Sequence, residues 1–125
     1  ILQISGAILG VMLANYIFVL DPVLFSEKPR SGTHLFVSEI LATFGLLMVI
    51  LLSAKEKVAV TVAAYIGAAY WFTSSTSFAN PAGTIGRSFS NTFAGISTND
   101  ILHFCVAQLI GALFALLVYN KFFKK

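Results

Sequence analysis

The stretch from Phe78 to Asn99 contains the residues whose types and spacing best suit a chemical task. Asn80 followed by Pro81 is a helix-start signature, because an asparagine side chain can accept hydrogen bonds from free backbone amides and proline fits the first helical position. The amides at such a start carry partial positive charge, so they can donate hydrogen bonds to a passing oxygen while the helix dipole opposes a cation. The chemistry indicated is recognition of an uncharged, oxygen-bearing molecule.

Catalysis and metal binding are poorly supported by the remaining polar residues. No nucleophile, base and orienting partner fall within one polar cluster, so an enzyme is the least favoured class. His34 and His103 are isolated and far apart in the sequence, and Cys105 is the only cysteine and lies in an apolar run. We therefore predict no metal site and no cofactor. The net charge of +3 forms no basic stripe, which argues against nucleic acid as a partner.

The elements that must position this stretch belong to a membrane protein. Hydrophobic residues make up 58% of the 125 residues and charged residues 10%, with a mean hydropathy of +0.88, whereas a soluble domain has about one quarter charged residues. Roughly 20 apolar residues cross a bilayer as a helix. We therefore predict an all-α polytopic membrane protein with four spanning helices, at residues 1–20, 34–53, 58–72 and 101–123.

Residues 78–96 are predicted to form a re-entrant loop and half-helix instead of a further span. The stretch is too short and too polar to cross the membrane, yet Phe89, Phe93 and Ile96 make it too apolar for an ordinary loop. We expect the half-helix to start at Asn80 and to stop at Gly95. A half-helix that begins at membrane depth is tolerated only where it lines a protein cavity or water, so a pore is the simplest reason for it.

Basic residues predict the orientation of the helices. One predicted side of the membrane carries more of them than the other, and the richer side should be cytoplasmic. This places the C-terminus inside. The richer group consists of Lys55, Lys57, Lys121, Lys124 and Lys125, and the poorer group of Lys28, Arg30 and Arg87.

The chain contains an internal repeat. Residues 3–8, with the sequence QISGAI, match residues 108–113, with the sequence QLIGAL, and at the same offset Asn15 meets Asn120. The first and fourth spans therefore look equivalent, and three spans make one unit. An odd number of helices per unit inverts the next copy in the membrane, which is an architecture of transporters and channels. Because Ile1 lies within an apolar run that has already begun, we expect the first copy of the repeat to lie upstream.

Residues 78–82, with the sequence FANPA, follow shortly after the third span, and Glu39 and Thr43 lie in the span before it. With the small-residue spans and the repeated Gln-x-x-Gly-Ala, this pattern resembles the aquaporin, or major intrinsic protein, family over essentially the whole chain. The resemblance implies an aquaporin-like fold, of which the chain would supply the third to sixth helices and the second half-helix. It also implies a homotetramer in a lipid bilayer, here a bacterial inner membrane, that passes small uncharged solutes.

The resemblance implies roles for individual residues. Asn80, followed by Pro81 and Ala82, would orient the solute oxygen midway along the pore. Glu39 would hold the re-entrant loop by accepting hydrogen bonds from its backbone amides, and Thr43 in the same span would also support the loop. The alternative for Glu39 is an interfacial residue stabilised by the free amides of a helix start. Exclusion of protons and cations by half-helix dipoles is known from aquaporin-type pores.

The outer filter implied by the resemblance is unusual. Family members usually carry arginine directly after Asn-Pro-Ala, where it narrows the filter, but this position is Gly83 here. Two other filter positions fall on Ala68 and Ser77, which are also small. The resemblance therefore implies a wide filter that suits glycerol-like solutes or metalloid hydroxides better than water alone, and a bacterial branch with this altered motif is similar.

Arg87 offers a possible substitute for the missing filter arginine. It lies four residues after Gly83, on the same helical face, and helical side chains lean toward the N-terminus. We hypothesise that its guanidinium reaches back into the volume that Gly83 vacates. The alternative is an arginine at the outer surface that pairs with Asp100 or with a phosphate.

Passive permeation through a channel is the leading prediction for function, with no covalent step. A coupled secondary transporter also uses inverted repeats and broken helices, but it needs ionisable residues to bind the coupling ion, and only Glu39 lies within a span. The other alternative is a non-transporting membrane scaffold, in which this chain packs against partners.

Overall fold

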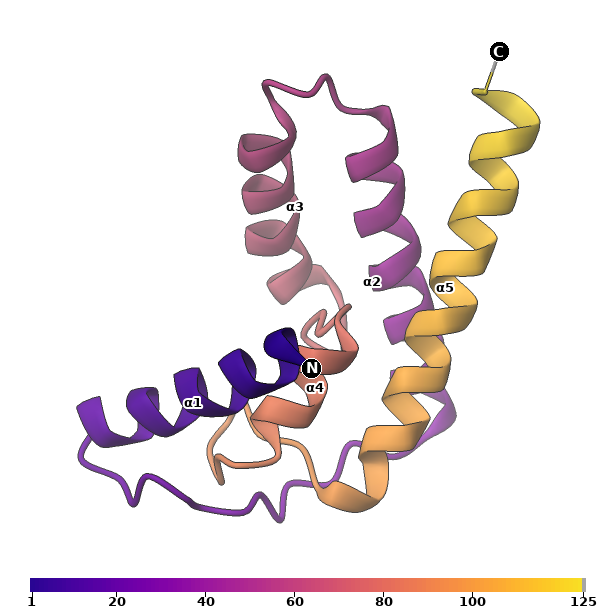
Figure 1. Ribbon diagram of the computed structural model, residues 1–125. Coiled ribbons are helices and arrows are strands. Elements are labelled where there is room, and N and C mark those ends of the chain that lie inside the picture. Colours follow the sequence, from indigo (N-terminus) through magenta and orange to yellow (C-terminus); the bar gives the residue numbers. More distant parts are fainter. Residues whose placement is uncertain (125) are drawn as a thin grey trace. The chain divides into compact units, whose positions relative to one another are not determined.

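The computed structural model describes residues 1–124, and among these residues it contains helices and no strands (Figure 1). The helices are α1 (Leu2–Ile17), α2 (Thr33–Leu52), α3 (Val58–Phe72), α4 (Pro81–Arg87), the short 3-10 helix η1 (Thr98–Asp100) and α5 (Ile101–Phe122). The prediction of an all-α fold is confirmed. Lys125, one of the lysines of the predicted cytoplasmic side, lies outside the described residues.

Helix α1 ends at Ile17, earlier than the predicted end at residue 20. The amide of Leu20 donates to the carbonyl of Asn15 (2.9 Å) and the amide of Val19 to that of Tyr16 (3.1 Å), which is the Schellman arrangement of a helix end. Val19 has a φ of 60°, a left-handed conformation that glycine usually supplies at this position. Because a β-branched residue fills it, the sequence gives no sign that the helix stops here.

The half-helix α4 ends at Arg87, so the predicted stop at Gly95 is wrong. The residues after Arg87 bond to the segment that follows α1 and do not continue the helix. The amide of Ser26 donates to the carbonyl of Ser88 (2.9 Å), and the amide of Leu24 donates to that of Phe89 (3.3 Å). These tertiary hydrogen bonds take the place of the next helical turn.

Two of the helical segments are long and apolar enough to cross a membrane. They are α2, with a mean hydropathy of 2.5, and the run Thr98–Phe122 that joins η1 to α5, with a mean hydropathy of 2.4. Helices α1 and α3 are apolar but shorter. Large apolar side chains are exposed along the helices, including Leu13, Leu41, Trp71 and Leu113. Helices that are apolar on the outside fit an integral membrane protein, in which lipid covers such surface.

The chain divides into two compact units. The first contains Ile1–Ser31 and Asn80–Cys105, and the second contains Gly32–Ala79 and residues 106–124. Helix α5 begins in the first unit and continues into the second.

In the first unit, α4 lies directly against α1. A Cβ atom built on Gly86 would be 2.9 Å from backbone and side-chain atoms of Ala7, so only glycine permits this approach. Close contact through small residues is the usual way in which membrane helices associate. Next to this pair, the ring of Phe25 packs against that of Phe89, with centroids 5.2 Å apart.

In the second unit, α2 packs against both α3 and α5. The hydroxyl of Tyr65 donates to the carbonyl of Ala42 (2.8 Å), which joins α3 to α2. A Cβ atom built on Gly111 of α5 would collide with the carbonyl oxygen of Ile40 on α2. Beside that crossing, the rings of Phe44 and Phe114 lie 5.2 Å apart. Helices α2 and α5 therefore approach closely at this crossing, with aromatic side chains beside it.

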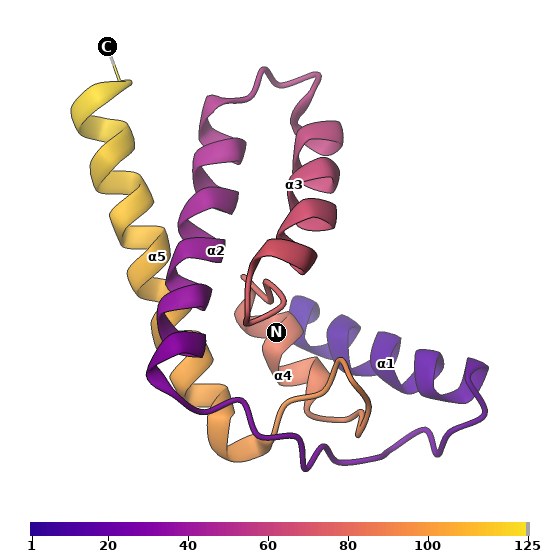
Figure 2. The same cartoon turned by 180° about the vertical axis from the view of Figure 1, so that it is seen from behind.

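The turn between α2 and α3 lies at the same end of the second unit as the end of α5, in Figure 1 and, from behind, in Figure 2. This turn carries Lys55 and Lys57, and the last turn of α5 carries Lys121. Lys55, Lys57 and Lys121, three of the lysines that were predicted to share one side of the membrane, are therefore at one end of this unit.

Candidate functional site

The start of α4 is capped as its sequence predicts. Asn80 has extended backbone angles, and its side-chain oxygen accepts hydrogen bonds from the amides of Ala82 (2.9 Å) and Gly83 (3.3 Å). Pro81 occupies the first helical position. Because the oxygen faces the helix, the side-chain nitrogen of Asn80 faces away from it. Asn80 is exposed, and within residues 1–124 this nitrogen makes no hydrogen bond, so it is available as a donor at the positive end of a helix.

The loop before Asn80 has a strained backbone. Thr76, Ser77 and Ala79 have φ values of 61°, 48° and 48°. A residue with a Cβ atom in this left-handed region costs roughly 1–2 kcal/mol. Strain of this kind persists only where the surroundings hold the chain, and it is common at functional sites.

Glu39 of α2 holds this loop. Its side chain is fully buried, with 0% exposure, and its carboxylate accepts hydrogen bonds from the amides of Phe78 (3.3 Å) and Ala79. The side-chain amide of Gln108 on α5 donates a third hydrogen bond (2.9 Å). Three donors satisfy a buried carboxylate that would otherwise be costly to keep away from water. The structure thus buries Glu39 inside the second unit, with the loop amides as its partners.

Thr43 does not take part in these contacts. Its hydroxyl is buried and has no hydrogen-bond partner among the described residues. A Cβ atom built on Gly111 would lie 3.1 Å from the Cβ atom of Thr43, so the side chain belongs to the crossing of α2 and α5. Thr43 therefore makes no side-chain hydrogen bond to the loop among the described residues, and its support of the loop stays a prediction.

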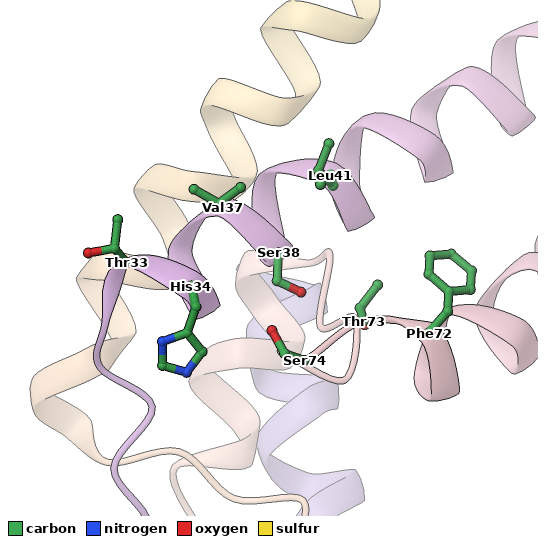
Figure 3. A pocket seen from close by; sticks show the side chains of 8 residues that line it. All are labelled: Thr33, His34, Val37, Ser38, Leu41, Phe72, Thr73 and Ser74. Carbon is green, nitrogen blue, oxygen red and sulfur yellow. The ribbon is translucent and has the colours of Figure 1, made fainter.

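A cavity of about 560 Å³ lies between the start of α2 and the segment after α3 (Figure 3). Ser38 lines this cavity and, like Glu39, connects α2 to the loop before Asn80. Its hydroxyl accepts a hydrogen bond from the amide of Ser75 (3.1 Å) and donates one to the Ser75 hydroxyl (3.3 Å). The cavity has no acidic side chain in its lining. The lining residues are Thr33, His34, Val37, Ser38, Leu41, Phe72, Thr73 and Ser74.

The predicted filter residues divide between the two units. Ala68 and Ser77 belong to the second unit, where Ala68 is exposed on α3 and Ser77 is buried. Gly83 and Arg87 belong to the first unit. A Cβ atom built on Gly83 would have only Asn80 atoms within 4 Å, at 3.7 and 3.8 Å, so the position is open to a larger side chain.

Arg87 lines a different space from the one beside Gly83. It contributes, with Asn15, Ser90 and Thr92, to a cavity of about 550 Å³ in the first unit. The rest of the lining is mainly apolar and comes from Val11, Ala14, Phe18, Leu20, Phe93 and Ala94. No side-chain atom of Arg87 lies within 4 Å of a Cβ atom built on Gly83. The idea that the guanidinium fills the volume beside Gly83 stays a prediction.

Two buried residues of the first unit were missed by sequence reasoning. Arg30 is 4% exposed; its Nε donates to the carbonyl of Gly95 (2.7 Å) and its guanidinium also donates to that of Phe93 (2.9 Å). Its backbone amide donates to Asp100 (2.7 Å). Arg30 therefore fastens the segment after α1 to the segment after α4.

Asn15 is the second residue of this kind. It is 3% exposed, and its side-chain nitrogen donates to the carbonyls of Phe89 (2.8 Å) and Pro22 (3.2 Å). Its side-chain oxygen accepts from the hydroxyl of Ser90 (2.7 Å). The repeat that pairs Asn15 with Asn120 was the one available signal, but it did not indicate which groups Asn15 binds.

Comparison with known proteins identifies a relative of the chain. It is 49% identical over 119 residues to aquaglyceroporin AqpS of Rhizobium meliloti (strain 1021), covering 93% of this chain and 51% of that protein. The chain thus spans about half the length of the curated relative that it matches. No family model matches the chain, and no solved structure matches it. The similarity agrees with the all-helical apolar fold and with the capped Asn80-Pro81 start of α4, and on these grounds the chain belongs to the aquaporin, or major intrinsic protein, family.

Proposed function

We propose that this chain forms part of a passive membrane channel for small uncharged solutes. The observation that carries the proposal is the start of α4, where the capped Asn80 leaves its side-chain nitrogen exposed as a hydrogen-bond donor. A solute hydroxyl or water oxygen can accept from this donor. A cation meets the positive end of the helix and a donor that cannot ligate it, so it is opposed. No covalent step and no cofactor are needed.

The proposed solutes are glycerol-like molecules or metalloid hydroxides in addition to water. Gly83 stands where the family usually carries arginine, and the space beside its Cα is open. The relative AqpS is named an aquaglyceroporin. A wide filter without arginine suits solutes larger than water that carry several hydroxyl groups.

Replacing Gly83 by arginine is expected to lower glycerol permeability about tenfold relative to water permeability, because it places a bulky cation at an open position of the path. Stopped-flow swelling of liposomes that contain the protein, with and without an inward glycerol gradient, measures both permeabilities. Gly83→Ala is the matched control, since the nearest atoms to its Cβ would be in ordinary contact, and its permeability ratio should stay close to that of wild type. An unchanged ratio in Gly83→Arg would show that residue 83 lies away from the solute path.

The proposed setting is a bacterial inner membrane with the C-terminus in the cytoplasm. The lysines at the shared end of the second unit support this orientation, because cytoplasmic ends of membrane helices are enriched in lysine and arginine. A homotetramer with one pore in each subunit is proposed from the family alone.

Flux measurements separate a passive channel from a coupled transporter. Glycerol entry into liposomes is expected to proceed down its gradient at the same rate with and without sodium, proton or potassium gradients. The rate should rise linearly with glycerol concentration. Accumulation against a glycerol gradient would indicate a coupled transporter, and absence of any flux above that of empty liposomes would indicate a non-transporting scaffold.

A further inference from the structure

The turn that follows α4 is bonded to α1 through the buried side chain of Asn15, beside the close contact of Gly86 with Ala7. Helix α4 has seven residues, too few for a helix to be stable without tertiary support. After Arg87 the chain forms tight turns: the amide of Phe89 donates to Gly86 (3.1 Å) and the amide of Ser90 donates to Arg87 (3.4 Å). The turn that contains Arg87 is thus closed by the residues that Asn15 binds.

Asn15 bonds to this turn through both the nitrogen and the oxygen of its side-chain amide. Its nitrogen donates to the carbonyl of Phe89, and its oxygen accepts from the hydroxyl of Ser90. The same nitrogen also donates to the carbonyl of Pro22 in the segment after α1. The amide nitrogen thus faces hydrogen-bond acceptors and the amide oxygen faces a donor. Turning the amide over would put donor against donor, so the side chain has one preferred position.

Arg87, Asn15 and Ser90 share the wall of one cavity. Arg87 is its cationic side chain, and it stands on the turn that Asn15 fixes. Val11 and Phe18 of α1 also line it. The hydrogen bonds of Asn15 therefore contribute to the position of Arg87 relative to α1.

We propose that Asn15 is a positioning residue for solute selection, which acts by setting the place of Arg87 in the wall of this cavity. The proposal rests on the proposed channel function and takes this cavity to lie on the path of the solute. Loss of the Asn15 hydrogen bonds removes two of the hydrogen bonds that hold the turn after α4, so the width of the cavity at Arg87 is less strictly fixed. Larger solutes should gain permeability relative to smaller ones, since a movable wall excludes them less strictly.

The test is a double-mutant cycle in liposomes that contain the protein as its gene encodes it. Permeabilities to glycerol and to the five-carbon polyol ribitol are measured for wild type, Asn15→Leu, Arg87→Ala and the double variant. Leucine has the branched shape and the number of side-chain heavy atoms of asparagine, is larger because methyl groups replace the oxygen and the nitrogen, and makes no hydrogen bond. Asn15→Leu is expected to raise the ribitol to glycerol ratio about fivefold, the equivalent of roughly one neutral hydrogen bond. In the Arg87→Ala background it is expected to have no further effect, because the two residues act together.

Each other result has a defined meaning. An unchanged ratio in Asn15→Leu overturns the proposal, and so does an equal rise in both backgrounds, since Asn15 would then act without Arg87. Should Asn15→Leu fail to assemble, Ser90→Ala removes only one of the Asn15 hydrogen bonds, and it must shift the ratio in the same direction. Asn99→Leu is the control, because Asn99 is exposed in η1. If the wild-type protein passes neither solute, the channel function fails first and this proposal fails with it.

Discussion

Replacing Glu39 by leucine is expected to give the largest loss of stability and of solute flux of any single substitution in this chain. It removes the acceptor to which the buried amides of Phe78 and Ala79 and the side chain of Gln108 donate. Loss of these hydrogen bonds by buried donors should cost about 3 kcal/mol or more of unfolding free energy. The left-handed residues of the loop also lose the contact that holds them, so Asn80 should lose its fixed position.

Thermal unfolding of the purified protein in detergent and glycerol swelling of liposomes measure the two effects. Glu39→Gln should be intermediate, because its amide oxygen still accepts from one backbone amide. Glu56→Leu is the matched control: Glu56 is exposed in the turn between α2 and α3, and this variant should unfold like wild type. A Glu39→Leu protein with wild-type stability and flux would mean that the loop is held by other contacts.

The second large effect is expected at the crossing of α2 and α5. Gly111→Leu should prevent the two helices from approaching, because even a Cβ atom at this position collides with the carbonyl oxygen of Ile40 and lies 3.1 Å from the amide nitrogen of Phe44. These are backbone atoms, which cannot turn away as a flexible side chain can. The helices must separate, and the hydrogen bond from Gln108 to Glu39 should lengthen with them.

Gly111→Ala should lower the free energy of unfolding by about 1–3 kcal/mol, as overpacking does in tight cores, and Gly111→Leu by more. Expression level and melting temperature in detergent report this order. Gly67→Ala on α3 is the comparison, since no atom lies within 4 Å of the added Cβ. Equal melting temperatures for Gly111→Ala and Gly67→Ala would contradict the close crossing.

The helix start at Asn80-Pro81 could be predicted from the sequence, whereas the side chains that hold the loop and the end of α4 could not be predicted from residue spacing. Asn80-Pro81 is a local signal, because a helix cap depends on residues that are neighbours in the chain. The long apolar runs located α2, α3 and α5 closely for a similar reason. The contact between Glu39 and the loop was expected only through the family resemblance, since nothing in their spacing brings the two together.

Tertiary hydrogen bonds to the backbone explain what was missed. Asn15 and Arg30 bind backbone carbonyls, which every residue possesses, so the partners have no signature in the sequence. The end of α4 was misplaced because residues 88–94 contain neither glycine nor proline. That helix stops where Asn15 and the segment after α1 compete for its next backbone groups, a competition that only the folded chain defines.

The central claim, that a donor at the start of α4 recognises uncharged solutes, is tested most directly by Asn80→Asp in liposome swelling and ion-leak assays. Aspartate keeps the oxygen that caps the helix but replaces the exposed donor by a negatively charged acceptor. We predict a folded protein with wild-type melting temperature, at least a roughly tenfold loss of glycerol flux, about the effect of one hydrogen bond to a polar partner, and a new leak of cations. Glycerol flux equal to that of wild type, without any cation leak, would contradict the account.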